Sequence, residues 1–146
     1  MIFRLLIDRN CQEEIIANVH ERTPLIDEIE RLVLQDGIAD EIAGYTEDAI
    51  TMLAIKDIEY FMVEDEKTYA VCGKNKKYHI RKRLYELEDL LNADFVRLSK
   101  SVIANKRKIV KYKTQFSGAV DAVFESGNTE CISRRCLAEL KRRYGL

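Results

Sequence analysis

The segment FVRLSKSVIANKRKIVKY, residues 95–112, changes character twice within a short length. It begins with the strand-like run FVRL, passes through the small polar residues SKS, and resumes with aliphatic residues in VIAN and IVKY. From Lys100 onward it carries five Lys or Arg residues. This pattern favours a short, polar, positively charged loop braced by strands on either side. Such a loop suits an anionic partner better than a packed core.

Runs of strand length dominate the rest of the chain after residue 45. ITMLAI, IEYFMV and KTYAVCG are separated by charged residues, and GKN before KKYHI is a hairpin signal. IVKYK, AVDAVFE and TECIS are further strand candidates, and the turn SGN precedes the last of them. RKRLYELEDLL and RRCLAELKRRYGL have leucines at helical spacing. The expected fold class is α+β, predominantly antiparallel β, with short helices between small sheets.

The first 44 residues follow a different pattern. MIFRLLID, residues 1–8, is typical of a strand, whereas EEIIANVHE, residues 13–21, fits a strand or a helix. In residues 23–37, Thr23 can cap a helix, Pro24 suits its first turn and Gly37 follows its last. This helix must bury one apolar stripe, which consists of Leu25, Ile26, Ile29, Leu32 and Val33.

Length and composition limit the possible classes of protein. A chain of 146 residues, 47% hydrophobic and 34% charged, can bury one good core and carry a small appendage. It has no apolar run near the roughly 18 residues of a membrane span and no secretion-signal pattern at its start. The four cysteines form no CxxC pair, which fits a reducing compartment. We therefore expect a cytoplasmic protein that does not insert into membranes.

Charge is distributed unevenly along the chain, although the net charge is only −1. Residues 1–60 hold five Lys/Arg against fourteen Asp/Glu, whereas residues 61–146 hold nineteen against eleven. From Phe95 onward there are twelve cations and four anions. The basic part is the candidate for a polyanionic partner, and the acidic part is expected to face something else.

Motifs for catalysis are missing from the sequence. There is no GxGxxG, GxxxxGK[ST] or HExxH, and the two histidines, His20 and His79, stand apart from each other and from any triad pattern. A small enzyme that pairs Cys131 or Cys136 with His79 is the remaining catalytic alternative. We expect no enzyme activity, no metal and no cofactor.

Residues 45–146 resemble the LytTR DNA-binding domain family. FVRLSKSVIANKRKIVKY is similar to the family's central motif, an aromatic-led strand, a Ser-rich turn, a Val/Ile-x-Asn element and an Ile-led strand. FSGAVDAVFESGNTECISRRCLAELK resembles its closing pattern of strand, Gly-Asn turn, Ser-Arg-Arg and terminal helix. AITMLAIKDIEYFMVEDEKTYAV and RKRLYELEDLL resemble its opening strands and Leu-rich helix. The resemblance is less specific for residues 1–44, which are too few for a receiver domain. The whole chain resembles the stand-alone LytTR regulators, which have a short strand and helix in that place.

The resemblance implies a sequence-specific transcriptional regulator with an elongated stack of small antiparallel sheets. Loops of that domain enter successive major grooves of double-stranded DNA, generally at paired sites. Carried over by position, the DNA-contact residues are Lys67, Ser99, Lys100, Ser101, Ser133, Arg134 and Arg135. The family also implies control by a neighbouring membrane protein in many stand-alone members.

Physical reasoning assigns these residues different roles. The guanidinium of Arg135 can take guanine O6 and N7 together, and Arg134 serves phosphate or a structural pair. Ser99 and Ser133 suit phosphate oxygens, while Lys100 and the cations at 106–108, notably Lys106 and Lys108, add sequence-independent affinity. We expect the amide of Asn105 to tie the loop backbone together, so that its loss damages folding as much as binding.

The cluster KNKKYHIRKR, residues 74–83, has the strongest local charge. Strand alternation divides it, with Lys76, Tyr78 and Ile80 on one face. Lys77, His79 and Arg81 lie on the other face, so only part of the cluster can meet one partner. It is either a flanking phosphate contact or a solvated edge that resists strand pairing.

Two questions about partners stay open at this stage. The acidic segment 1–44 would be repelled by DNA, so the strand at 1–8 and the helix at 23–36 are expected to form a homodimer contact. The basic part could alternatively bind RNA or an acidic protein, although few aromatic residues accompany its cations.

Overall fold

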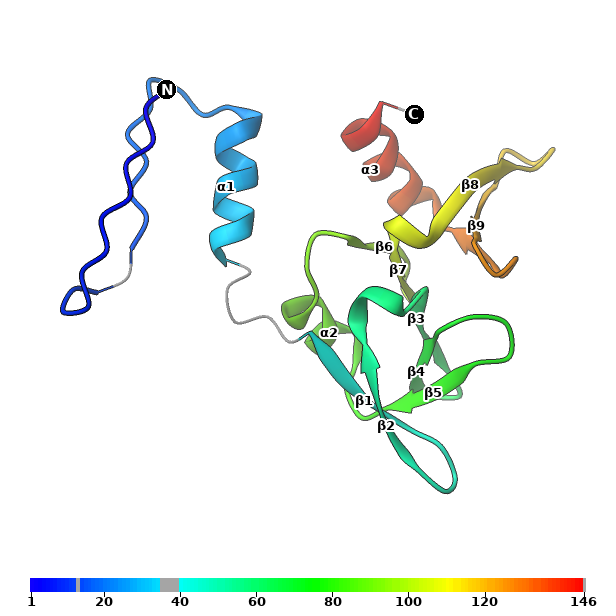
Figure 1. Cartoon of the computed structure of the whole chain (residues 1–146). Helices are drawn as coiled ribbons and strands as arrows, with labels where there is room; N and C mark the ends of the chain where they lie inside the picture. Colours follow the sequence, from blue (N-terminus) through cyan, green and yellow to red (C-terminus); the bar gives the residue numbers. More distant parts are fainter. Residues whose placement is uncertain (13, 35–39, 146) are drawn as a thin grey trace. The chain divides into compact units, whose positions relative to one another are not determined.

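The computed structural model describes residues 1–12, 14–34 and 40–145, which form two compact units, Met1–Asp36 and Gly37–Leu146 (Figure 1). The sequence analysis expected a boundary between residues 44 and 45. This position lies within a strand, β1 (Glu41–Tyr45), which belongs to the second unit. The sequence analysis missed β1, because EIAGY is short and carries a glycine.

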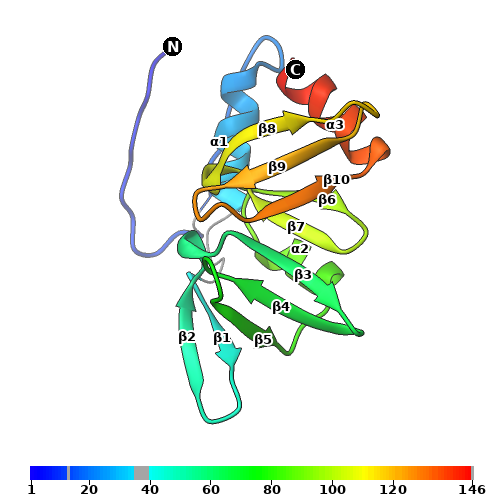
Figure 2. The same cartoon turned by 90° about the vertical axis from the view of Figure 1, so that its right-hand side faces the viewer.

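The second unit contains two antiparallel sheets (Figure 2). The larger sheet has seven strands: β1, β2 (Ile50–Ala54), β3 (Tyr60–Glu64), β4 (Lys67–Val71), β5 (Lys77–Ile80), β6 (Phe95–Ser99) and β7 (Val102–Asn105). Their spatial order is β2-β1-β5-β4-β3-β7-β6. The smaller sheet has the order β10-β9-β8, with β8 (Ile109–Thr114), β9 (Val120–Phe124) and β10 (Thr129–Ile132). The predicted α+β class with mainly antiparallel strands is confirmed.

Helices in this unit are short. α2 (Leu84–Leu90) joins β5 to β6, and α3 (Arg134–Tyr144) follows β10 directly. Two 3₁₀ turns, η1 (Ile55–Asp57) and η2 (Lys106–Lys108), precede β3 and β8. α3 ends at Gly145, whose φ of 66° is the left-handed conformation that closes a helix at low steric cost.

The larger sheet has a hydrophobic core on each face. Phe61 packs with Ile80 and with Leu87 of α2, whereas its neighbour Tyr60 packs with Phe124 of the smaller sheet and Leu140 of α3. Phe61 and Phe124 are 0% and 1% exposed, and burying such a side chain contributes roughly 1.5–3 kcal/mol. α2 therefore stabilises one face of β3, and the smaller sheet with α3 stabilises the other.

Glu59 joins the two sheets by hydrogen bonds. Its carboxylate is 4% exposed and accepts from the backbone N–H of Ser126 at 3.1 Å, from the Ser126 hydroxyl at 2.6 Å and from Asn128 Nδ2 at 3.3 Å. The Ser126-Gly127-Asn128 turn predicted from the sequence is thus confirmed, and it also fixes the smaller sheet against the start of β3. A buried carboxylate is tolerated here because its oxygens are hydrogen-bonded.

The central segment is built largely as the sequence predicted. Residues 95–112 form β6, β7 and the start of β8, separated only by Lys100-Ser101 and by η2. The short polar turn braced by strands is thus confirmed, and it consists of only two residues. All four residues of β7 are buried, so the VIAN run is an interior strand of the larger sheet.

The first unit contains α1 (Pro24–Leu34), whose first turn is capped as predicted: the Ile26 N–H donates to Thr23 Oγ1 at 3.4 Å. The expected position of Gly37 lies outside the described residues. The strand expected at residues 1–8 does not form in the single chain, because a strand needs a hydrogen-bonded neighbour and none pairs with it within the described part of the chain.

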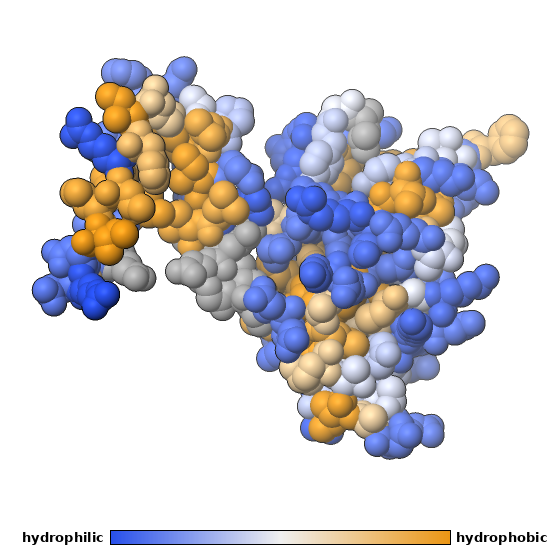
Figure 3. Space-filling view, viewed as in Figure 1, coloured by the Kyte–Doolittle hydropathy of each residue, from blue (hydrophilic) through white to orange (hydrophobic). Residues whose placement is uncertain are grey.

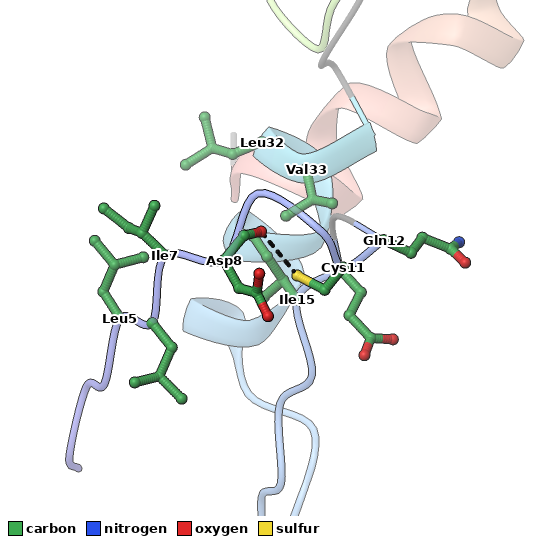
Figure 4. A pocket seen from close by; sticks show the side chains of 10 residues that line it. Leu5, Ile7, Asp8, Cys11, Gln12, Ile15, Leu32 and Val33 are labelled. Carbon is green, nitrogen blue, oxygen red and sulfur yellow. Dashed lines mark hydrogen bonds between the residues drawn. The ribbon is translucent and has the colours of Figure 1, made fainter.

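Apolar side chains remain exposed throughout this unit, as the orange atoms of Figure 3 show. Leu32 of α1 is 56% exposed. Leu5, Ile7 and Ile15 surround a hollow that Leu32 and Val33 close from the helix side, as Figure 4 shows. Ile15 also lines a second hollow with Ile26 and Ile29. Within the first unit, the apolar stripe of α1 is therefore only partly covered.

Candidate nucleic-acid interface

Three chain connections of the second unit meet at one edge of the sheets. The β3–β4 turn closes on the pair Glu64 and Lys67, and Val63 beside it donates its N–H to the carbonyl of Ser101 at 2.9 Å. Ser133, at the start of α3, donates its N–H to the carbonyl of Leu98 at 2.8 Å. The β3–β4 turn, the β6–β7 turn and the β10–α3 junction are thus neighbours, on the right of Figure 2. We refer to these connections as the turn edge.

The β6–β7 turn is held by Arg97, a residue that the sequence analysis did not single out. Its Nε donates to the Ser99 carbonyl at 2.7 Å and its Nη2 to the Lys100 carbonyl at 2.8 Å. Its Nη1 pairs with Glu88 of α2 at 2.9 Å. The β-bulge between Arg97 and Ser99 turns these carbonyls toward the guanidinium. In the sequence, the signal that could have indicated this role of Arg97 is a cation inside a predicted strand, directly before a small polar turn.

The same turn presents the three central residues predicted from the sequence. Ser99 Oγ accepts from the Ser101 N–H at 3.2 Å, which orders the turn internally. Lys100 is exposed, and within the described residues its ammonium has no hydrogen-bond or ion-pair partner. Arg97 therefore fixes the backbone, while Lys100 remains available to an external anion.

Ser133, Arg134 and Arg135 begin α3. The Ser133 hydroxyl accepts from the Cys136 N–H at 3.2 Å and caps the helix. Arg134 and Arg135 are exposed and have no ion-pair partner among the described residues. Cations in a first turn oppose the helix dipole by about 0.3–1 kcal/mol each. This local conflict suggests a requirement other than stability, and an anion bound at the helix start would relieve it.

The β3–β4 turn mixes both signs of charge. Asp65 and Glu66 adopt positive φ values of 50° and 65°, the geometry of a tight hairpin turn, and Lys67 follows them exposed at the start of β4. Two carboxylates beside Lys67 weaken its attraction for phosphate. Of the predicted positions on the turn edge, Lys67 consequently has the least favourable electrostatic surroundings.

Lys106 and Lys108 lie at the opposite end of β7, in η2. Lys106 Nζ is 3.4 Å from the Tyr144 hydroxyl, and Lys108 Nζ is 3.5 Å from a Glu125 carboxylate oxygen. Between them, Arg107 pairs with Asp94 at 3.0 Å. The structure therefore does not bring these cations to the turn edge, and their predicted phosphate contacts remain a prediction.

Asn105 behaves as the sequence analysis expected. It is 2% exposed, and its Nδ2 donates to the carbonyls of Lys56 at 3.2 Å and Ile58 at 3.1 Å. Its Oδ1 accepts from the Arg107 N–H at 3.1 Å. One amide thus joins η1, β7 and η2, so Asn105 is a structural residue.

The basic cluster at residues 74–83 divides between two faces as predicted. Tyr78 and Ile80 pack toward the core beside α2. His79 lies on the opposite face between Tyr45 and Tyr69, with ring centroids 6.4 and 5.8 Å away. The imidazole therefore has aromatic neighbours.

One of the two thiols in the catalytic alternative, that of Cys131, lacks the property that a nucleophile needs. Desolvation raises the pKa of the Cys131 thiol, with Asp121 adding to the effect, and burial raises the pKa of Cys72 to about 11. Both remain protonated at neutral pH, whereas a nucleophilic cysteine needs a thiolate. Among the described residues no group of three or more His, Cys, Asp or Glu side chains could hold a metal ion. No helix in the described part of the chain is long and apolar enough to cross a membrane.

These features define a β-rich domain that exposes cations from turns along one edge. The chain belongs to the LytTr DNA-binding domain family, which matches residues 48–145. It is similar to an uncharacterised HTH-type transcriptional regulator of Staphylococcus aureus strain bovine RF122 / ET3-1, with 32% identity over 105 residues, 72% of this chain and 71% of that protein. A counterpart in S. aureus strain NCTC 8325 / PS 47 is 31% identical over the same shares.

A solved structure has the same fold. The LytTr DNA-binding domain of a methyl-accepting/DNA response regulator from Bacillus cereus superposes with a TM-score of 0.68 at 20% identity, covering 74% of this chain and 99% of that one. In this chain α3 follows strand β10 directly, so its start is positioned by a sheet. The class HTH-type in the names of the S. aureus relatives therefore does not describe how α3 is presented in this chain.

Proposed function

We propose that this chain is a sequence-specific, double-stranded DNA-binding transcriptional regulator, whose turns read major grooves. The observation that carries the proposal is the turn edge, where Lys100, Arg134 and Arg135 are exposed and lack ion-pair partners among the described residues. Membership of the LytTr family and similarity to S. aureus proteins named as transcriptional regulators support it.

The residues of the turn edge take different roles in this proposal. Arg135 reads a guanine edge, because its planar fork fits O6 and N7, and Arg134 meets phosphate. Ser99, Ser101 and Ser133 donate hydroxyl hydrogens to phosphate oxygens, which leaves the bonds that the Ser99 and Ser133 hydroxyls accept intact. Lys67 and Lys100 add charge at the groove. Lys106 and Lys108 contribute weaker, sequence-independent attraction, because each already has a partner.

Fluorescence anisotropy on the chain's own upstream promoter DNA, with excess nonspecific duplex as competitor, tests this proposal. Arg135→Ala should lower the preference for promoter over competitor by about 1–3 kcal/mol, or roughly five- to 150-fold, with little change in nonspecific binding. Lys56→Ala is the matched control, because Lys56 is an exposed cation in η1, at the opposite end of β3 from the turn edge. If excess competitor duplex removes all binding of the wild type to the promoter, the proposal is contradicted for this promoter.

The regulator is proposed to act as a homodimer on paired sites, through its first unit. The exposed side chains Leu5, Ile7, Leu25 and Leu32 are more than half exposed, which is unfavourable for a monomer in water. A second copy would cover them, and the unpaired segment at residues 1–8 would gain a strand partner. Two linked domains would then bind two half-sites with increased avidity.

Sedimentation of the full chain tests the dimer. Leu25→Glu with Leu32→Glu should convert a dimer to a monomer, because two charges would be buried in the interface. Ile50→Glu with Met52→Glu is the matched control, since these exposed apolar residues belong to β2 of the second unit. A wild type that sediments as a monomer would contradict the dimer, and would assign the apolar surface to a different partner, such as the neighbouring membrane protein implied by the family.

Competition decides between DNA and the alternative partners of the basic surface. An RNA or acidic protein that displaced promoter duplex at equal concentration, while random duplex did not, would identify a binding module for that class instead. Under the present proposal the promoter duplex is the strongest competitor.

A further inference from the structure

Three rings lie in a row on one face of the larger sheet. Tyr45 of β1 pairs in register with His79 of β5, and His79 pairs with Tyr69 of β4. Lys77 and Arg81 share the alternating face of β5 with His79. We call these five residues the aromatic–cation stripe. None of these five residues belongs to the turn edge.

Cations cover the two tyrosine rings of the stripe. Lys77 Nζ is 4.3 Å from the Tyr69 ring centroid, and Arg81 Cζ is 4.0 Å from that of Tyr45. Such contacts contribute about 0.5–1 kcal/mol at exposed sites and restrict the long side chains. Each ring therefore has a face that is already occupied, which disfavours stacking of unpaired bases, while the ordered charges can meet phosphate.

The stripe is continuous with the turn edge. Ile80 pairs with Thr68, so the following residue, Arg81, comes level with Lys67 at the start of β4. Arg81 is exposed and makes no ion pair among the described residues, whereas Lys77 is paired with Glu64. The carboxylates that follow in register at this end of the sheet are those of the β3–β4 turn, residues 65 and 66.

We propose that the aromatic–cation stripe is a further DNA contact, which binds the phosphate backbone of the duplex beyond the turn edge. Arg81 is the principal contact, and Tyr45 beneath it holds the guanidinium in place. Lys77 contributes less, because Glu64 neutralises part of its charge. The inference rests on the proposed DNA-binding function and extends the protein's footprint on the same duplex.

The salt dependence of anisotropy on the promoter duplex measures the contact. Each phosphate neutralised by a cation contributes about 0.9 to the slope of log K against log salt. Arg81→Gln should lower the slope by about that amount and weaken specific and nonspecific duplex equally, whereas Arg81→Lys should retain most of it. Lys56→Gln is again the matched control and should leave the slope unchanged.

Glu64→Gln provides a test of opposite sign. Removing this carboxylate frees Lys77, so duplex affinity should rise severalfold and the slope should steepen. The gain should disappear in the double variant Glu64→Gln with Lys77→Gln. Thermal unfolding of each variant shows whether the domain is still folded.

The outcomes separate the inference from the function on which it rests. If the wild type prefers promoter to competitor but Arg81→Gln keeps the wild-type slope, the stripe is not a DNA contact and the proposed function stands. If Arg81→Gln weakens single-stranded RNA alone, the stripe serves RNA and the inference is overturned. A wild type without preference for any duplex overturns the proposed function itself. If Arg81→Gln unfolds at a temperature different from that of the wild type, Glu64→Gln and its double variant with Lys77→Gln decide instead. A gain in slope that disappears in the double variant supports the inference, and an unchanged slope in Glu64→Gln overturns it.

Discussion

The two ends of β7 carry similar cations in different surroundings. At the β6–β7 turn, Lys100 is exposed and has no partner among the described residues. At the other end, every cation of η2 has a partner within the chain: Lys106 with Tyr144, Arg107 with Asp94, and Lys108 with Glu125. Local charge density is higher in η2, yet two of its three cations are ion-paired and Lys106 is held by a hydroxyl and a ring, whereas the cation at the turn has no partner among the described residues. A cluster of cations therefore marks an interface only if the fold leaves it without partners.

The backbone is also fixed differently at the two ends. Asn105, a neutral buried amide, joins the η2 end to η1, whereas the charged and half-exposed Arg97 organises the turn end. A buried amide suits a permanent structural contact, because leaving its partners unsatisfied is costly. The following predictions test this contrast, from the largest expected effect to the smallest.

Asn105→Ala should have the largest effect. It removes the donor to the carbonyls of Lys56 and Ile58 and the acceptor of the Arg107 N–H, and leaves these buried groups unsatisfied. We expect the free energy of unfolding in urea to fall by about 3 kcal/mol or more. Asn92→Ala, which removes only one bond, to the Asp94 N–H, is the control and should lose no more than about 1 kcal/mol. Equal losses in the two variants would contradict the structural role of Asn105.

Arg97→Met should loosen the turn while keeping the side-chain stem packed. The two turn carbonyls and Glu88 lose their donor, and we expect a loss of about 1–3 kcal/mol in stability. DNA affinity should fall as well, although Arg97 is not itself a proposed contact, because the turn would no longer be ordered. Arg107→Met in η2 is the control, since its guanidinium is 74% exposed and makes one ion pair. The contrast fails if Arg107→Met weakens DNA binding as much.

Lys100→Ala and Lys106→Ala compare the two ends directly. Lys100→Ala should lower the salt slope of duplex binding by about 0.9, the share of one phosphate contact. Lys106→Ala should change it by less, because its ammonium already lies near the Tyr144 hydroxyl and ring. Titrations of both variants at several salt concentrations measure the difference. A larger effect for Lys106 would place the main phosphate contact at η2.

Glu130→Gln should have the smallest effect and a defined pH dependence. Burial raises the pKa of Glu130 in the folded protein above its ordinary value of 4.5. The folded state then binds more protons than the unfolded state between the two pKa values, so wild-type stability falls as the pH rises through this window. The variant should lack this fall and gain slightly on the wild type toward neutral pH. Urea unfolding of both proteins at several pH values checks the sign. A stability advantage of the variant that grows toward acid pH would contradict it.

Much of the second unit could be predicted from its sequence. The strands at KTYAV and KKYHI, their hairpin and the helix at RRCLAELKRRY depend on local periodicity and turn residues, which operate within a few positions. β1 and Arg97 could not be predicted this way. β1 forms because β2 and β5 pair with it, and Arg97 matters because a bulge brings two carbonyls to its guanidinium.

The sequence by itself determined the fold class, the alternation that separates the two faces of β5, and the capping of α1 and α3, because each depends on the chemistry of neighbouring residues. Only the tertiary structure decided which cations are free. Lys106 and Lys108 find partners 38 and 17 residues away, whereas Lys100 has none among the described residues. Partners come together through space, so the occupation of a cation by a distant hydroxyl or carboxylate cannot be read from a local pattern. The proposed DNA-binding edge is therefore a property of the assembled sheets.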